Sequence, residues 1–128
     1  MSGAGDRLSE NACSGHPAVD AYLADGYESV RGMSSRFAAA ISAWLLGHQT
    51  RLGLTGDVVE IGAFEGRFLI ALALGLPEGE HALGLDVFEW PNPQVLDRFI
   101  AHGARFGLNP PRYEPWKVHT SALTPTSF

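Results

Sequence analysis

The hydrophobic pattern changes repeatedly after Gly56, and this alternation constrains the fold more than any other feature of the chain. Short apolar runs bounded by glycine, which are typical of buried strands, alternate with longer apolar runs that are typical of helices. The predicted strands are Asp57–Ile61, His81–Asp86 and Trp116–Thr120, and the predicted helices between them are Arg67–Leu76 and Gln94–Phe106. Strands that alternate with helices in this order form a parallel sheet with right-handed crossovers. We therefore expect an α/β domain with three parallel strands over residues 57–128.

A polar tail and two helices are predicted ahead of the sheet. Residues 1–15 are rich in small polar residues and are expected to be a disordered tail. Residues 16–56 are expected to form a helical lead-in, with helices at Pro17–Ala24 and Ser34–Leu52. Helical spacing gives the second helix one continuous face, which we expect to pack in the core and which consists of Phe37, Ile41, Trp44, Leu45 and His48.

The composition of the chain excludes several classes of binding partner and indicates the cellular compartment. The chain has 128 residues, 45 % of them hydrophobic, and a formal net charge of −5, which suits one globular domain. The negative charge argues against binding to nucleic acid or to an anionic membrane surface, and no apolar run is long enough to span a bilayer. Cys13 is the only cysteine and the five histidines are widely spaced, so we expect no intrachain disulfide and no metal site. We expect a cytoplasmic protein.

Two glycines follow the first predicted strand, in the pattern Gly62-x-x-x-Gly66. Glycine at this place lets the backbone turn sharply and lets a ligand approach it closely. The pattern differs from the dinucleotide fingerprint because Phe64 replaces the middle glycine, and from the phosphate-binding loop because Arg67 follows the second glycine. The glycine spacing alone fits an ordinary strand–helix turn and a ligand site equally well.

Acidic residues favour the ligand site. Glu60 lies in an otherwise apolar strand, where a carboxylate needs a partner, either an arginine or a ligand. Asp86 ends the second strand, where an acid binds ribose hydroxyls in related architectures or closes an Asx turn. Glu65 is expected to be a solvated loop acid. Carboxylates beside this loop would repel a pyrophosphate and suit a ligand with a positive end, while Val87 and Phe88 either line an adenine ring or only pack.

Three segments together resemble the class I S-adenosylmethionine-dependent methyltransferases, more narrowly bacterial O-methyltransferase-like members. Val58–Arg67, with the sequence VVEIGAFEGR, is similar to their motif I, and Gly84–Phe88 is similar to their second-strand acidic motif. Trp116–Ser121 resembles the third strand and the turn that contacts adenine. The resemblance covers about Ser34 to Thr124 and implies a Rossmann-like parallel sheet with S-adenosyl-L-methionine as cofactor.

The resemblance implies a role for each matching residue. Glu60 would hold the region of the methionine amino group, and Gly62, Ala63 and Gly66 would let the backbone pass under the methionine part. Asp86 would bind the ribose hydroxyls, Val87 would pack on adenine, and Ser121 would approach the adenine edge. Relatives often carry an acid where Thr120 stands. The segment before the second helix, with Tyr27 and Met33, helps to close the site in relatives.

The same resemblance predicts that the chain is the N-terminal half of a seven-stranded domain. Acceptor and catalytic residues of the family lie mainly after the fourth strand, so we identify no catalytic residue here. The first strand would then have an open edge, so the isolated chain would be either marginally stable or self-associating. The favoured function is methyl transfer to a hydroxyl of a small-molecule acceptor. The alternatives are a half-domain of an NAD-dependent oxidoreductase and a non-catalytic, truncated interaction module.

The remaining aromatic and histidine side chains are expected either to pack in the protein or to border the site. Trp44 and Trp116 are expected in the core, whereas Trp90 either covers a pocket or packs in a loop. His119 either acts as a general base near the ligand or packs against a helix.

Overall fold

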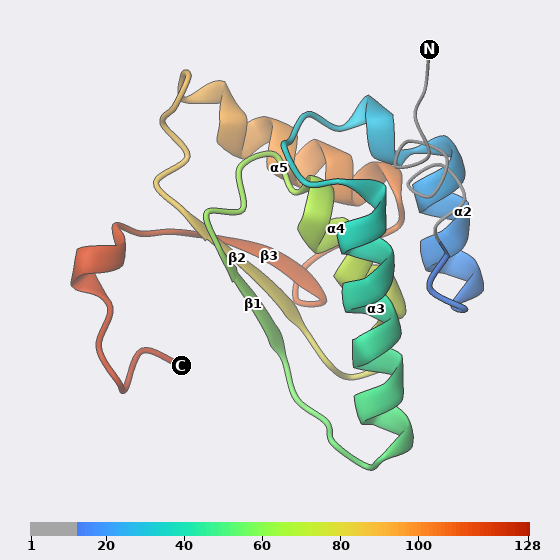
Figure 1. The fold of residues 1–128 in the computed structure, drawn as a ribbon. Coiled ribbons are helices and arrows are strands. Elements are labelled where there is room, and N and C mark those ends of the chain that lie inside the picture. Colours follow the sequence, from blue (N-terminus) through green and yellow to red (C-terminus); the bar gives the residue numbers. More distant parts are fainter. Residues whose placement is uncertain (1–12) are drawn as a thin grey trace.

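The computed structural model describes residues 13–128 (Figure 1). Helices α2 and α3 precede the sheet, and strands then alternate with helices as the sequence predicts. The elements in order are α2 (Pro17–Asp25), the 3-10 turn η1 (Tyr27–Ser29), α3 (Arg36–Arg51), β1 (Val58–Ile61), α4 (Arg67–Gly75), β2 (Ala82–Asp86), α5 (Gln94–Arg105), β3 (Tyr113–Lys117) and η2 (Thr120–Ala122). The prediction of an α/β domain with N-terminal helices is confirmed.

The three strands form one parallel sheet in the order β1-β2-β3. Val58 lies opposite Ala82, which in turn lies opposite Tyr113. Because successive right-handed crossovers proceed in one direction across the sheet, α4 and α5 lie on the same face, as Figure 1 shows. The arrangement is an open α/β sheet consistent with half of a Rossmann-like fold.

The core lies between this face of the sheet and the helices. Helix α4 is buried almost all round, from Leu69 to Ala73. Phe99 of α5 stacks on Tyr113 of β3 with ring centroids 4.4 Å apart, and the Tyr113 hydroxyl donates to the Phe99 carbonyl at 3.3 Å. Burial of these apolar side chains drives the packing of α4 and α5 on the sheet.

Helix α2 is anchored at both ends. Asp20 accepts hydrogen bonds from the Ser14 backbone N–H at 2.6 Å and from the Ser14 hydroxyl at 2.7 Å, and Ser14 is buried. The Tyr22 hydroxyl donates to the Arg67 carbonyl at 2.8 Å, which joins α2 to α4. Residues 1–12 of the predicted tail lie outside the described residues.

The third strand begins three residues earlier than predicted, at Tyr113 instead of Trp116. Pro115 lies within this strand. The Val118 N–H donates to the Asp86 carbonyl, and the Ala82 N–H donates to the Arg112 carbonyl. The backbone N–H and C=O groups of the even-numbered residues in this segment therefore point toward β2. Position 115 therefore directs its backbone nitrogen away from β2, at an edge strand where proline costs no hydrogen bond.

Helix α3 packs through the opposite face from the one we predicted. Its buried residues are Ala39, Ala40 and Ala43, which lie toward α4 and α2. The predicted core face is about half exposed, and Trp44, expected in the core, is 47 % exposed. Small alanines allow α3 to approach α4 closely, and this close approach leaves the large apolar stripe outside. Trp116 is partly buried, and its ring contacts Phe128 edge-on at 5.7 Å.

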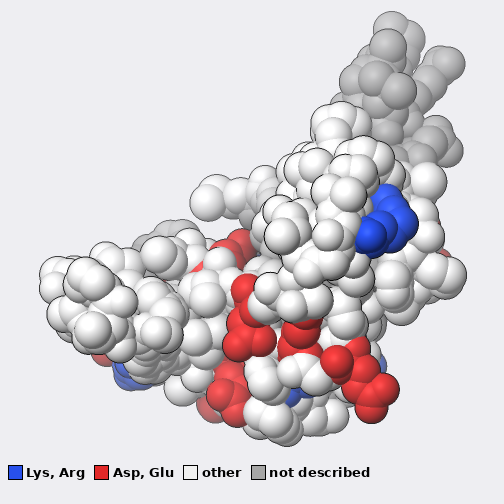
Figure 2. Space-filling view, turned by 90° about the horizontal axis from the view of Figure 1, so that it is seen from below, with Lys and Arg blue, Asp and Glu red and all other residues white. Residues whose placement is uncertain are grey.

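Within residues 13–128, no helix is both long and apolar enough to cross a membrane. Figure 2, which shows the molecule from below, has acidic side chains gathered on this face. The loops that precede β1 and β2 contribute acids to this end of the molecule at Asp57, Glu78 and Glu80.

Candidate functional site

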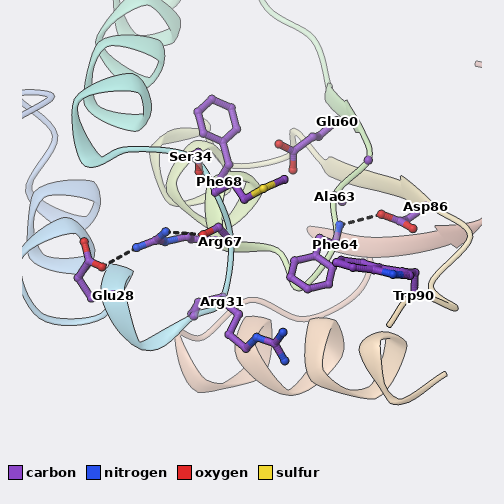
Figure 3. Close-up of a pocket in the computed structure, with 14 residues that line it drawn as sticks. Glu28, Arg31, Ser34, Glu60, Ala63, Phe64, Arg67, Phe68, Asp86 and Trp90 are labelled. Atoms are coloured by element: carbon purple, nitrogen blue, oxygen red, sulfur yellow. Dashed lines mark hydrogen bonds and ion pairs between the residues drawn. The ribbon is translucent and has the colours of Figure 1, made fainter. Parts of the chain in front are cut away.

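A cavity of about 720 Å³ opens at the carboxyl ends of β1 and β2 (Figure 3). Its walls come from the β1–α4 loop, the end of β2, the first turn of α4 and the segment between η1 and α3. The lining residues are Glu28, Val30, Arg31, Gly32, Met33, Ser34, Glu60, Gly62, Ala63, Phe64, Arg67, Phe68, Asp86 and Trp90. This is the end of a parallel α/β sheet at which ligands bind, and the volume suits a small-molecule site.

The β1–α4 loop follows the cavity with its backbone. Gly62 has φ +82°, a left-handed conformation that glycine adopts without strain, and no atom would meet a Cβ there within 4 Å. Two residues later, the Phe64 N–H donates to Asp86 Oδ2 at 2.9 Å, which fixes the loop to the end of β2. The loop thus presents an open backbone surface beside the end of β2.

Asp86 connects the two loops at the cavity. Its Oδ2 accepts from the Phe64 N–H, and its Oδ1 accepts from the Phe88 N–H at 2.9 Å, as in an Asx turn. Each carboxylate oxygen has two acceptor positions, so one remains on each oxygen. The structure therefore shows the turn role that the sequence left open, and the side chain also lines the cavity.

Glu60 is the least satisfied polar side chain at the site. Its Oε1 is buried and has no hydrogen-bond partner among the described residues. Burial, followed by the nearby Asp86 carboxylate, raises the Glu60 pKa to about 7. No arginine forms an ion pair with it in the described part of the chain. In Figure 3 the carboxyl group points into the cavity, where a cationic group would satisfy it.

One wall of the cavity is a strap, which we define as residues 28–34. Arg67 holds the strap: its Nε donates to the Tyr27 carbonyl at 3.1 Å, its Nη1 to the Gly32 carbonyl at 2.8 Å and its Nη2 to Glu28 at 2.7 Å. The Tyr27 hydroxyl lies 2.6 Å from Ser34 Oγ at the other end of the strap. Met33 on the strap is fully exposed and lines the cavity.

Aromatic side chains form the opposite wall. Phe64 and Trp90 lie with ring centroids 6.0 Å apart, and Trp90 is 73 % exposed. Of the two readings given for Trp90, the structure supports the one in which it borders a pocket. The Arg31 guanidinium lies 5.8 Å from the centre of the Phe64 ring.

The structure brings Glu60, Gly62, Ala63 and Asp86 together at the cavity, but not every predicted residue. Gly66, Val87 and Ser121 do not line it. A Cβ at Gly66 would overlap the Tyr113 hydroxyl, so this glycine permits close packing in the core.

Three further candidate residues, Ser121, His119 and Phe88, have packing or turn roles. Ser121 lies in η2 and its hydroxyl is 2.7 Å from His119 Nδ1, an exposed pair. Phe88 is buried and packs edge-on against Phe99 at 5.2 Å, so it does not offer a face to a ligand in the cavity.

The prediction that Glu65 is a solvated loop acid is wrong, because this residue is only 1 % exposed. It pairs with Arg31 at 3.6 Å and with His102 at 3.4 Å. Sequence reasoning also missed Arg31, Arg67 and Phe68 as cavity residues. Their contacts join segments far apart in the chain, and no local pattern encodes such contacts. Of the two candidates that the resemblance gave before the second helix, Met33 lines the cavity, whereas Tyr27 is buried and does not line it.

Across residues 13–128 no three His, Cys, Asp or Glu side chains are grouped so that they could hold a metal ion. No protein family matches the chain, and no curated protein or solved structure matches it significantly.

Proposed function

We propose that the cavity binds S-adenosylmethionine and that the chain is the cofactor-binding part of a methyltransferase. The observation that carries this proposal is the pair of carboxylates, Glu60 and Asp86, at the ends of neighbouring strands. Glu60 has a buried oxygen without a partner, and a buried carboxylate is costly unless a cation or donor satisfies it. S-adenosylmethionine carries two cationic groups, the amino group and the sulfonium, and has no phosphate.

The nucleoside half of this ligand also finds matching groups. The acceptor positions that remain on Asp86 suit the two ribose hydroxyls, because a carboxylate at this place can accept from both. The exposed Trp90 ring and the Phe64 ring offer apolar surface for adenine. The resemblance of Val58–Arg67 and Gly84–Phe88 to methyltransferase motifs supports the same placement.

The chain's own residues would bind and orient the cofactor. The cofactor supplies an electrophilic methyl group, and much of the rate of such a transfer comes from aligning the acceptor with it. We assign no residue to the acceptor. A small-molecule hydroxyl compound remains the proposed acceptor class.

The main rival is an NAD-binding oxidoreductase half-domain. Its pyrophosphate would meet the Glu60 and Asp86 carboxylates, which repel negative charge. The Gly62–Gly66 turn also lacks the middle glycine that lets a pyrophosphate approach the backbone. Both features favour the sulfonium nucleoside.

Calorimetric titration of the full chain tests the proposal. S-adenosylmethionine and S-adenosylhomocysteine should bind more tightly than NAD or ATP. Asp86→Asn keeps one acceptor oxygen for the turn but loses the charge, and it should weaken binding roughly tenfold or more, since a hydrogen bond to a charged group contributes about 1.5–3 kcal/mol. Glu89→Gln is the matched control, because Glu89 is an exposed acid three residues away that does not line the cavity. Tighter binding of NAD would reject the proposal.

A further inference from the structure

Glu65 is a buried carboxylate that does not line the cavity, although it lies in the β1–α4 loop between Phe64 and Gly66. A buried charge is costly unless other groups pair with it. Glu65 Oε2 lies 3.6 Å from Arg31 Nε, and Glu65 Oε1 lies 3.4 Å from His102 Nε2. Two segments that are far apart in the chain therefore meet at this one carboxylate.

Arg31 connects this carboxylate to the cavity. It belongs to the strap, lines the cavity and has a side chain that is 62 % exposed. Its guanidinium lies 5.8 Å from the centre of the Phe64 ring, and Figure 3 shows the side chain reaching from the strap toward that ring. Arg67 fixes the same strap to α4 by donating to the Gly32 carbonyl. The pair of Arg31 and Glu65 thus fixes the strap to a second element, the β1–α4 loop.

The charged side chains next to Glu65 are basic. On α5, Arg98, His102 and Arg105 follow one face of the helix at steps of four and three residues. His102 contacts Glu65, and Arg105 donates to the Ser29 hydroxyl on the strap, so this face of α5 is turned toward the loop and the strap. Arg98 Nη1 is buried and has no hydrogen-bond partner among the described residues. Without the charge of Glu65, basic side chains of the strap and of α5 would face each other, and like charges repel.

We propose that Glu65 is a positioning residue, which acts through Arg31 to hold the strap against the β1–α4 loop in the position that binds the ligand. The carboxylate attracts Arg31 from the strap and His102 from α5, so it joins three segments beside the cavity. Glu65 itself does not touch the ligand. The effect on binding rests on the proposed function, whereas the attachment of the strap does not.

Hydrogen exchange of backbone amides tests the attachment of the strap without any ligand. On the strap, the Val30 N–H donates to the Tyr27 carbonyl at 3.3 Å. Outside the strap, the Gly26 N–H donates to the Tyr22 carbonyl at 2.8 Å. Glu65→Gln should make the Val30 amide exchange several times faster and leave the Gly26 amide unchanged, because the strap opens locally while the rest of the fold stays closed.

Two further variants complete the exchange experiment. Arg31→Gln changes an exposed side chain and should accelerate exchange at Val30 to the same extent, so it tests the same contact even where Glu65→Gln does not fold. Glu78→Gln, the matched control, makes the same substitution in the exposed turn before β2 and should change neither amide. Unchanged exchange at Val30 in folded Glu65→Gln or in Arg31→Gln, or equal acceleration at Val30 and Gly26, would overturn the proposal.

Calorimetry with S-adenosylhomocysteine as the probe tests whether Glu65 acts through Arg31. Glu65→Gln and Arg31→Gln should each weaken binding roughly three- to tenfold, and the double variant should bind no more weakly than either single variant. Additive losses, or unchanged affinity in both single variants, would overturn the positioning role. A natural chain that does not bind S-adenosylhomocysteine would reject the proposed function, and hydrogen exchange would still decide whether Glu65 holds the strap.

Discussion

Glu60 is an acidic side chain in an apolar strand, and burial raises its carboxyl pKa to about 7 from an ordinary value of 4.5. The folded state therefore holds a proton that the unfolded chain has lost over this interval. Because the unfolded state binds fewer protons there, the free energy of unfolding falls as pH rises from 4.5 to about 7 and then stays level. The folded protein is thus less stable when Glu60 is ionised, and the ionised carboxylate is the form that would bind a cation.

Glu60→Gln should separate stability from binding. The variant should be more stable than the natural chain above pH 7 by about 1–3 kcal/mol, with the difference vanishing toward acid pH. The same variant should bind S-adenosylmethionine roughly ten- to a hundredfold more weakly, because a charge-assisted contact is lost. Urea unfolding at several pH values and calorimetry measure the two effects. A variant that is less stable and binds equally well would show that Glu60 is only structural.

Two glycines of one loop should respond differently to alanine. Gly62→Ala adds a Cβ in open space at positive φ and should cost about 1–2 kcal/mol of stability from backbone strain alone. Gly66→Ala has the same strain and also drives a Cβ into the Tyr113 hydroxyl and the Phe99 ring, so it should cost roughly 1–3 kcal/mol more. Equal losses in urea unfolding would show that the core relaxes around residue 66.

The elements of the sheet were predictable from periodicity, and their packing was not. The order of strands and helices followed from apolar runs and glycine boundaries between Gly56 and Gly107. Helix α3 was found, but its large apolar stripe was assigned to the core, because a periodic pattern does not show that alanines on the other face pack more closely. For β3 the predicted strand begins three residues too late, since a sequence does not show that the nitrogen of Pro115 faces outward at an edge.

Arg67 is the connection between helix α4 and the strap. Arg67→Lys keeps the charge but cannot reproduce three hydrogen bonds to separate acceptors, one on Tyr27 and two on the strap. We expect a loss of about 1–3 kcal/mol in the free energy of unfolding and weaker binding of S-adenosylhomocysteine. Arg51→Lys, at the exposed end of α3, is the control and should change stability by less than about 0.5 kcal/mol. Similar effects of the two substitutions would mean that Arg67 does not hold the strap.

At the scale of the whole molecule, the site combines residues that local sequence motifs predict with residues that only contacts between distant segments bring there. The predicted part of the cavity lining, Glu60, Gly62, Ala63 and Asp86, came from motifs at strand ends. The strap wall came from residues far away in the chain, and the burial of Glu65 depends on Arg31 and His102. A local pattern carries no information on such long-range pairs, so the pairing of Glu65 with Arg31 and His102 was not predicted.

The most direct test of the account is amide chemical-shift mapping of the full chain titrated with S-adenosylhomocysteine. We expect saturable shifts in the β1–α4 loop, at 62–64, at the end of β2, at 86–90, and in the strap. The amides of Ser121 and of the α2 helix should stay unchanged, because they lie outside the cavity. NAD at the same concentration should cause smaller shifts. Shifts confined to η2 or to the α3 stripe, or no saturable shifts at all, would contradict an S-adenosylmethionine site at the carboxyl ends of β1 and β2.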